Sequence, residues 1–244
     1  MDLGQKGVFC FTDALTPTQL VELAQRTEEL GYAALWYPEV VSYESFGLGG
    51  FLLAHTLVKD ARGHEYRPPV ATMRAYLEDM DKAAAIAPQL DEPPPTVLAA
   101  LGPQMIALAG RRTSGAFPYN VTPEHTARAR TILGPNKWLC VEQKVLLVNE
   151  PAKAREIARQ VIAFYLPLTN YRNNWKRLGF ADEDLEGGGS DRFLDAMVAW
   201  GSETAIRQRI QAHFDAGANH VCIQPLHPEG QSLPDYNALR VLAS

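Results

Sequence analysis

Between Thr16 and Gly31, apolar residues recur every three or four positions, which predicts a helix with one buried stripe. Thr16 is a suitable N-cap for this helix and Gly31 a left-handed C-cap. Residues 33–37 follow as a short, wholly apolar run, the pattern of a strand that is covered on both faces. Pro38 ends this strand and places Glu39 just beyond its carboxyl end, where parallel α/β folds bind their ligands.

The same arrangement returns near the other end of the sequence. A helix is predicted over 202–217, closed by Gly217, and a strand over 219–224 that Pro225 terminates. Two such units predict an α/β fold in which helices wrap a parallel sheet. Further strands are predicted at 7–12, 96–101, 115–119 and 138–148, and further helices at 42–55, 69–87, from 103, and at 122–133, 151–166 and 168–178.

Length and composition narrow the class of protein. The 244 residues are close to the roughly 250 that one (β/α) barrel typically needs. The net charge of −5 without a basic run argues against a nucleic-acid partner, and no apolar stretch approaches the roughly 20 residues of a membrane helix. The start, MDLGQKGVFCF, lacks the features of a signal peptide. Cys10, Cys140 and Cys222 lie far apart in sequence, each within a predicted strand. This pattern is typical of buried, unpaired cysteines in a reducing compartment and favours a cytoplasmic protein.

The pattern yields six strands, whereas a complete barrel of this kind has eight. The shortage lies between the predicted helices at 42–55 and 69–87, where residues 57–68 are polar and carry no strand signal. We therefore predict a single domain over 1–244, an incomplete TIM-type barrel with an internal deletion near 56–62.

Three segments resemble a known family: ELGYAALWYPE, ALGPQMIALAGRRTSGAF and GSETAIRQRIQAHFDAGANHVCIQP. They are similar to the luciferase-like monooxygenase superfamily, and within it to the branch of F-420-dependent oxidoreductases. The resemblance runs in order over nearly the whole chain. It implies a (β/α)8 barrel of the bacterial luciferase-like class, a flavin or deazaflavin at the carboxyl ends of the strands, and commonly a homodimer.

The sequence departs from that branch at two places. Members carry a third strand, a third helix and a fourth strand between the positions that match His55 and Arg62, and these elements are missing here. In the family, these elements would help to form the wall of the pocket around the cofactor ring. Many relatives also have a histidine directly after the acidic residue that ends the second strand, and this chain has Val40 there.

One turn has the pattern of a phosphate site. Gly102, Pro103 and Gln104 lie between a predicted strand and the start of a helix, where free N–H groups and the helix dipole favour an anion. Because Pro103 has no N–H, Gln104 and Met105 would supply the donors. In the family that the chain resembles, this turn contacts the phosphorylated part of the cofactor. The alternative is an ordinary connection from strand to helix.

The end of the same helix offers a second set of candidate phosphate ligands. Ser114 can donate a hydroxyl to phosphate, and Gly115 permits a close backbone approach. Arg111 and Arg112 could neutralise the charge of the phosphate, or could simply solvate the last turn of the helix. Ser114 and Gly115 are predicted to join Gly102, Pro103 and Gln104 in binding the cofactor.

Two carboxylates and one histidine are candidates for chemistry. Asp13 and Glu39 end neighbouring predicted strands, so both side chains could face one pocket. Glu39 is predicted to be a catalytic acid or base and Asp13 a cofactor ligand, although acidic residues also end strands merely because they are soluble. His64, in the irregular segment RGHEYRP, is a second catalytic candidate because it titrates near neutrality; the alternative is a surface histidine.

Other polar residues add less. The histidines show no metal-ligand spacing, so no metal site is predicted. Tyr171, Asn174 and Trp175 share one face of a predicted helix and could line a substrate pocket or belong to the core.

The leading functional hypothesis is an oxidoreductase that transfers hydride between coenzyme F-420 and a small organic substrate. A deazaflavin reacts poorly with oxygen, which favours dehydrogenase or reductase chemistry over oxygenation. One alternative is an FMN-dependent monooxygenase of the same superfamily. Another is a vestigial flavin-binding or scaffold protein without catalysis, which the missing elements and Val40 favour. A homodimer that shields the open edge of the sheet near the second strand is also predicted.

Overall fold

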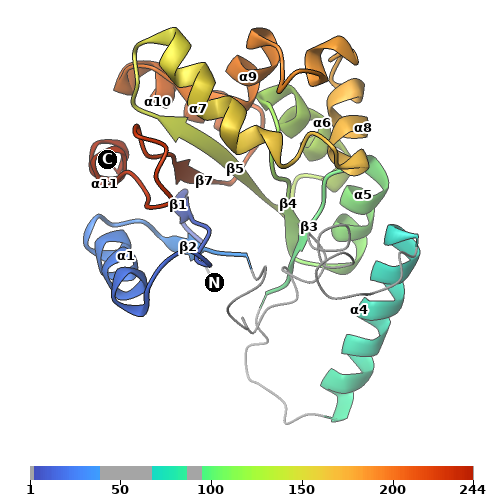
Figure 1. Ribbon diagram of the computed structural model, residues 1–244. Coiled ribbons are helices and arrows are strands. Elements are labelled where there is room, and N and C mark those ends of the chain that lie inside the picture. Colours follow the sequence, from blue (N-terminus) through green and yellow to red (C-terminus); the bar gives the residue numbers. More distant parts are fainter. Residues whose placement is uncertain (1–2, 39–67, 87–94, 244) are drawn as a thin grey trace.

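A curled parallel sheet lies at the centre of the computed structural model, which describes residues 3–38, 68–86 and 95–243 (Figure 1). The strands of the described part are β1 (Lys6–Phe9), β2 (Ala34–Trp36), β3 (Val97–Ala99), β4 (Gly115–Phe117), β5 (Trp138–Leu146), β6 (Val198–Trp200) and β7 (His220–Pro225). Their order is β2-β1-β7-β5-β4-β3, and β6 pairs with β5. Because β2 and β3 end this order without pairing to each other in the described part, the barrel is open, as the sequence predicted.

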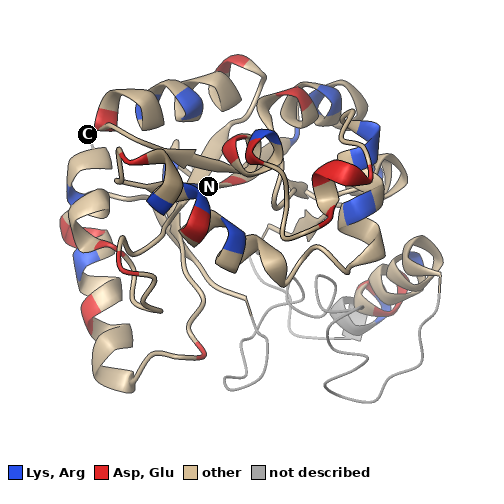
Figure 2. Cartoon of the chain, turned by 45° about the horizontal axis from the view of Figure 1, so that its top comes forward, with Lys and Arg blue, Asp and Glu red and all other residues tan. Residues whose placement is uncertain are grey.

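Helices connect the strands and cover the outer side of the sheet (Figure 1). They are α1 (Pro17–Glu29), α4 (Pro69–Ile86), α5 (Pro103–Arg112), α6 (Pro123–Leu133), α7 (Pro151–Ala163), α8 (Thr169–Arg177), α9 (Asp191–Met197), α10 (Glu203–Asp215) and α11 (Tyr236–Leu242), with a 3-10 turn at Glu183–Leu185. Their ends follow the local sequence. Thr16 caps α1 by accepting a hydrogen bond from the N–H of Gln19, and Gly31 after it has a φ of +76°. Basic and acidic side chains are interspersed over these helices (Figure 2).

The central strand β5 divides the core into two parts because its side chains alternate between the two faces of the sheet. Leu139, Val141 and Val145 face outward and pack with apolar residues of α5, α6 and α10. Cys140 faces the inside of the barrel, where it packs with Phe9, Phe117, Tyr119 and Cys222 from the neighbouring strands. The inner core continues into α7, α8 and α9, whose buried apolar residues pack against these side chains.

A buried histidine joins two outer helices to β5. The imidazole of His213, on α10, bonds through Nδ1 to the hydroxyl of Thr126 on α6 at 2.8 Å and through Nε2 to Oε1 of Gln143 at 3.0 Å. Gln143 in turn donates to the carbonyl of Met197 at the end of α9. Burial, with the nearby Arg209, lowers the pKa of His213 to about 3, so this histidine is neutral in the folded protein.

All six strands predicted from the sequence are confirmed, and the structure adds β6. β6 has three residues and follows α9 directly, without a glycine or proline between them, so no local signal separates helix from strand. The predicted helix at 42–55 and the deletion near 56–62 lie outside the described residues.

The buried His213 makes stability depend on pH. The unfolded chain takes up a proton near pH 6.5, whereas the folded protein does so only near pH 3. The free energy of unfolding should therefore fall as the pH drops through this window, by up to about 1.4 kcal/mol per pH unit from this group. Urea unfolding between about pH 5 and pH 7 should show a shallower pH dependence for His213→Gln than for the unmodified protein. Equal slopes would show that His213 is not buried as a neutral group.

Candidate active site

A cavity of about 570 Å³ opens at the carboxyl ends of β1 and β7. The segments that follow these two strands form one side, and α7, α8 and the residues between them form the other. This is the end of a parallel barrel at which active sites lie. Of the described residues that line it, Asp13 is the only carboxylate and none is a lysine or arginine. The cavity is therefore suited to a ligand, or part of one, that is not strongly anionic.

Aromatic rings form one wall of the cavity. Phe9, Tyr119, Tyr165 and Tyr171 line it and make successive ring contacts, with centroid distances of 5.2, 5.5 and 5.2 Å along the row. These separations are those at which aromatic rings attract one another. The four aromatic residues come from β1, the end of β4 and the region of α7 and α8, so the wall exists only in the folded barrel.

The hydroxyl groups of this wall form a short hydrogen-bonded chain. The oxygens of Tyr165 and Tyr119 lie 3.1 Å apart, and Tyr119 donates to Oε1 of Gln224 at 2.8 Å. Gln224 is on β7 and lines the cavity. Burial raises the pKa of both tyrosines, most strongly that of Tyr119, so both hydroxyls keep their protons.

Beneath the tyrosines lies a buried ion pair. Glu142 and Lys144 are two positions apart on β5, so both point to the inside of the barrel, and their side chains are 1% and 0% exposed. The ammonium nitrogen is 3.3 Å from each carboxylate oxygen, 2.5 Å from Oδ1 of Asn120 and 4.0 Å from the centre of the Tyr119 ring. Burial raises the pKa of Glu142 and lowers that of Lys144, while the charge of each partner opposes the shift of the other.

Asn120 fixes the turn after β4. Its φ is +57°, a conformation that asparagine tolerates better than most residues. Its N–H donates to Glu142 at 3.3 Å, and its carbonyl accepts from the indole N–H of Trp175 at 3.1 Å. The Nδ2 atom of Asn120 is buried without a hydrogen-bond partner. The charged pair thus holds the backbone from which Tyr119 projects.

His227 lies on the segment after β7 and lines the cavity. Its Nδ1 accepts a hydrogen bond from the backbone N–H of Glu229 at 3.2 Å. A neutral imidazole in this arrangement carries its proton on Nε2. Nε2 has no partner among the described residues, so it is available to a ligand.

Of the residues that the sequence predicted as an acidic pair, the structure describes one. Asp13 lines the cavity, as expected for a residue after β1. Glu39 and His64 lie outside the described residues, and their predicted roles remain predictions. Pro38, which precedes Glu39, lines the cavity as well.

The turn at Gly102 has the predicted position at the N-terminus of α5. Gly102 is the N-cap, with φ −82° and ψ 157°, and no side chain caps the helix. The N–H of Met105 donates to the carbonyl of Gly102 at 3.1 Å, so only Gln104 of the two predicted donors is left for an anion. Pro103 occupies the first turn and has no N–H to offer.

The second set of predicted phosphate ligands lies elsewhere. Ser114 directly precedes β4 and Gly115 begins it, at the opposite end of α5 from Gly102, and a ten-residue helix spans about 15 Å. A Cβ atom on Gly115 would lie 2.3 Å from the carbonyl oxygen of Trp138, so this glycine permits strand packing. The structure therefore does not bring Ser114 and Gly115 together with the Gly102 turn around one phosphate.

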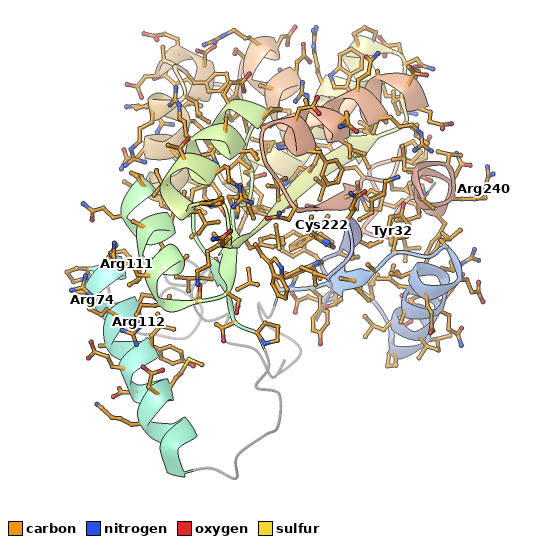
Figure 3. All side chains as sticks on the ribbon, turned by 180° about the vertical axis from the view of Figure 1, so that it is seen from behind. Tyr32, Arg74, Arg111, Arg112, Cys222 and Arg240 are labelled. Atoms are coloured by element: carbon orange, nitrogen blue, oxygen red, sulfur yellow. The ribbon has the colours of Figure 1, made fainter. Side chains whose placement is uncertain are left out.

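The arginines near Ser114 also lie away from the cavity. Arg111 and Arg112 are in the last turn of α5, beside α4 on the outside of the protein (Figure 3). Arg112 pairs with Asp81 of α4 at 2.7 Å. Figure 3 shows both arginines far from Cys222, which marks the inside of the barrel. The ion pair of Arg112 thus joins the end of α5 to α4.

The predicted helix face at α8 is divided between the cavity and the core. Tyr171 lines the cavity, whereas Trp175 is fully buried and Asn174 is buried with an unpaired Nδ2. Sequence analysis did not single out Gln224 or His227. Both stand at or just after the end of a strand, before and after Pro225, which is the same signal that pointed to Glu39.

No group of three or more His, Cys, Asp or Glu side chains within the described residues could hold a metal ion. None of the described helices is both long and apolar enough to span a membrane.

No family model matches the sequence, and no curated protein matches it. Among solved structures, a coenzyme F-420 dependent tetrahydromethanopterin reductase from Methanopyrus kandleri matches with a TM-score of 0.74 and 14% identity, over 100% of this chain and 98% of its own. An F-420-dependent secondary alcohol dehydrogenase matches with a TM-score of 0.66 and 13% identity, over 98% of this chain and 97% of its own. A third match is the oxygenating constituent of 3,6-diketocamphane monooxygenase from Pseudomonas putida, in complex with FMN. Its TM-score is 0.59 and its identity 12%, over 100% of this chain and 97% of its own.

These similarities establish the fold. The chain has the parallel α/β barrel fold of these structures, as the sequence predicted, and the barrel is incomplete in the described part of the chain. At 12 to 14% identity the likeness does not transfer a reaction or a cofactor.

The buried pair beneath the cavity can be tested by a double-mutant cycle. Lys144→Met leaves the Glu142 carboxylate buried without a cation, which should cost about 3–5 kcal/mol of stability. Glu142→Leu combined with Lys144→Met should cost less than Lys144→Met alone, because no uncompensated charge remains. Urea unfolding of the variants measures both values. A double variant that is as unstable as the sum of the two single changes would contradict a charged pair.

Proposed function

We propose that this chain is a luciferase-like oxidoreductase that transfers hydride between coenzyme F-420 and a small organic substrate. The observation that carries the proposal is the aromatic-walled cavity at the carboxyl ends of β1 and β7, in a barrel whose structural neighbours include two F-420-dependent enzymes. A cavity of this size is within the range of about 300–1,000 Å³ that is usual for small-molecule sites.

The residues of the cavity suit the ring end of such a cofactor. Phe9, Tyr119 and Tyr165 offer a flat apolar wall, and Gln224 and His227 offer N–H groups from β7 and the segment after it. A bound deazaflavin would supply the hydride-carrying ring. The protein would bind and orient this ring, exclude water with its aromatic wall, and hold the substrate beside it.

The anionic tail of the cofactor needs a different place, because the described lining has no lysine or arginine. The turn of Gly102 and Gln104 supports this role. It stands at the carboxyl end of β3, at the positive end of α5, and a Cβ atom on Gly102 would meet nothing within 4 Å. Ser114 and Gly115 are not proposed to share this anion, because they lie at the other end of α5.

Two alternatives remain proposals. An FMN-dependent monooxygenase is supported by the structural neighbour that was solved with FMN. A vestigial binding or scaffold protein without catalysis is supported by the gap between β2 and β3 among the described strands. A homodimer that covers an open sheet edge, and a cytoplasmic location, are further proposals from the sequence.

Parallel titrations with coenzyme F-420 and FMN test the proposal. We expect saturable binding of coenzyme F-420, followed by its reduction or oxidation in the presence of a substrate. Tighter binding of FMN, with oxygen consumption on reduction, would favour the monooxygenase. Binding of either cofactor without turnover for any donor or acceptor would favour the vestigial protein, and no binding of either would overturn the proposal.

A substitution at Gly102 tests the proposed anion site. Gly102→Val should leave the fold intact, because the backbone there is extended and the space beside it is open. The side chain should obstruct the approach of phosphate to the turn and weaken cofactor binding by tenfold or more, on the order of 1.4 kcal/mol. Ser114→Ala is the matched control and should bind normally. Unchanged affinity in a folded Gly102→Val protein would exclude this turn.

A further inference from the structure

The amide of Gln224 is oriented by the tyrosines behind it. Its Oε1 accepts from Tyr119, whose own oxygen lies 3.1 Å from that of Tyr165. The amide nitrogen, Nε2, has no partner among the described residues, and Gln224 lines the cavity. With the oxygen turned toward Tyr119, the two N–H groups are left for the cavity.

The position of Tyr119 is itself fixed. The ammonium of Lys144 lies 4.0 Å from the centre of its ring, and the ion pair with Glu142 is fully enclosed. Because the tyrosine hydroxyls stay protonated, Tyr119 remains a donor to Gln224. A buried hydrogen-bonded network of this kind holds its members in one arrangement.

His227 adds a second donor from the same end of β7. The backbone N–H of Glu229 occupies Nδ1, which leaves the proton of the neutral ring on Nε2. Gln224 and His227 line one cavity, and both present N–H groups that no described residue accepts. No lysine or arginine is among the described lining residues, so an anion is not the expected guest.

We infer that Gln224 and His227 form a two-donor site that holds an uncharged carbonyl oxygen of a flat, apolar ligand against the tyrosine wall. Tyr119 and Tyr165 are positioning residues, which keep the amide of Gln224 turned with its nitrogen toward the ligand. The carbonyl belongs either to the ring of the cofactor or to a carbonyl substrate. Which molecule carries the carbonyl rests on the proposed function. The binding of a carbonyl oxygen by these two residues can be tested without any cofactor.

The experiment compares 1-indanone with indane, two flat probes that differ in the carbonyl oxygen. Binding to the full-length protein is followed by the NMR signals of the Gln224 side-chain amide and the His227 imidazole. We expect 1-indanone to bind tighter than indane by about two- to tenfold for each hydrogen bond gained. Gln224→Leu and His227→Phe should each reduce this preference. Equal affinity of the two probes for the unmodified protein would overturn the inference.

Two further variants separate positioning from loss of fold. Tyr119→Phe keeps the ring but removes the donor to Gln224, so the preference for 1-indanone should fall while the NMR spectrum remains that of a folded protein. Gln211→Leu is the matched control, because Gln211 is exposed on α10 and its amide bonds only to Asp215. Unchanged preference in both Tyr119→Phe and Gln224→Leu would overturn the inference, and a loss in Gln211→Leu would show that the preference arises elsewhere.

Binding of lumiflavin, a flavin ring without phosphate, shows whether the bound carbonyl belongs to the cofactor or to the substrate. If its affinity falls in Gln224→Leu and His227→Phe, the site holds a ring carbonyl of the cofactor. If its affinity is unchanged while that of 1-indanone falls, the site holds a substrate carbonyl. A carbonyl preference that persists in a protein that binds neither coenzyme F-420 nor FMN would sustain the site and overturn only the proposed function.

Discussion

The buried pair of Glu142 and Lys144 is the interaction on which the architecture of the site depends. Their ion pair lies in β5, the longest strand of the described residues, with 1% and 0% of the two side chains exposed. Such charges are tolerated only when neighbouring groups satisfy them. Asn120 does so through its side-chain oxygen and its backbone N–H, and this draws the end of β4 toward β5. Tyr119, the residue before Asn120, belongs to the aromatic wall of the cavity.

Both faces of β5 carry polar groups, and the groups on the two faces have different structural roles. On the outer face, Gln143 and His213 join the sheet to α6 and α10 through a neutral network. On the inner face, Glu142 and Lys144 support the aromatic row above them. The alternation of side chains along one strand thus separates the part that holds the helices from the part that shapes the cavity.

The cavity draws its walls from distant parts of the chain. β1 and β7 are neighbours in the sheet although they lie near opposite ends of the sequence. Their carboxyl ends bring Asp13 together with Gln224 and His227. The open edge between β2 and β3 in the described part does not reach this junction, which is closed by the pairing of β1 with β7 and of β7 with β5. An incomplete barrel can therefore keep a formed cavity.

The sequence by itself determined the elements and the fold class. Thr16, Gly31 and Pro225 mark helix and strand ends through local backbone chemistry, and the resemblance to luciferase-like proteins placed these elements in the right barrel. It also predicted that Asp13 faces a pocket, because a residue after a parallel strand lies at a known end of the sheet, and Asp13 is among the residues that line the cavity. Tertiary structure alone decided which strand ends meet and that β6 forms beside β5. These outcomes depend on pairings and packing between residues far apart in sequence, for which no local pattern carries a signal.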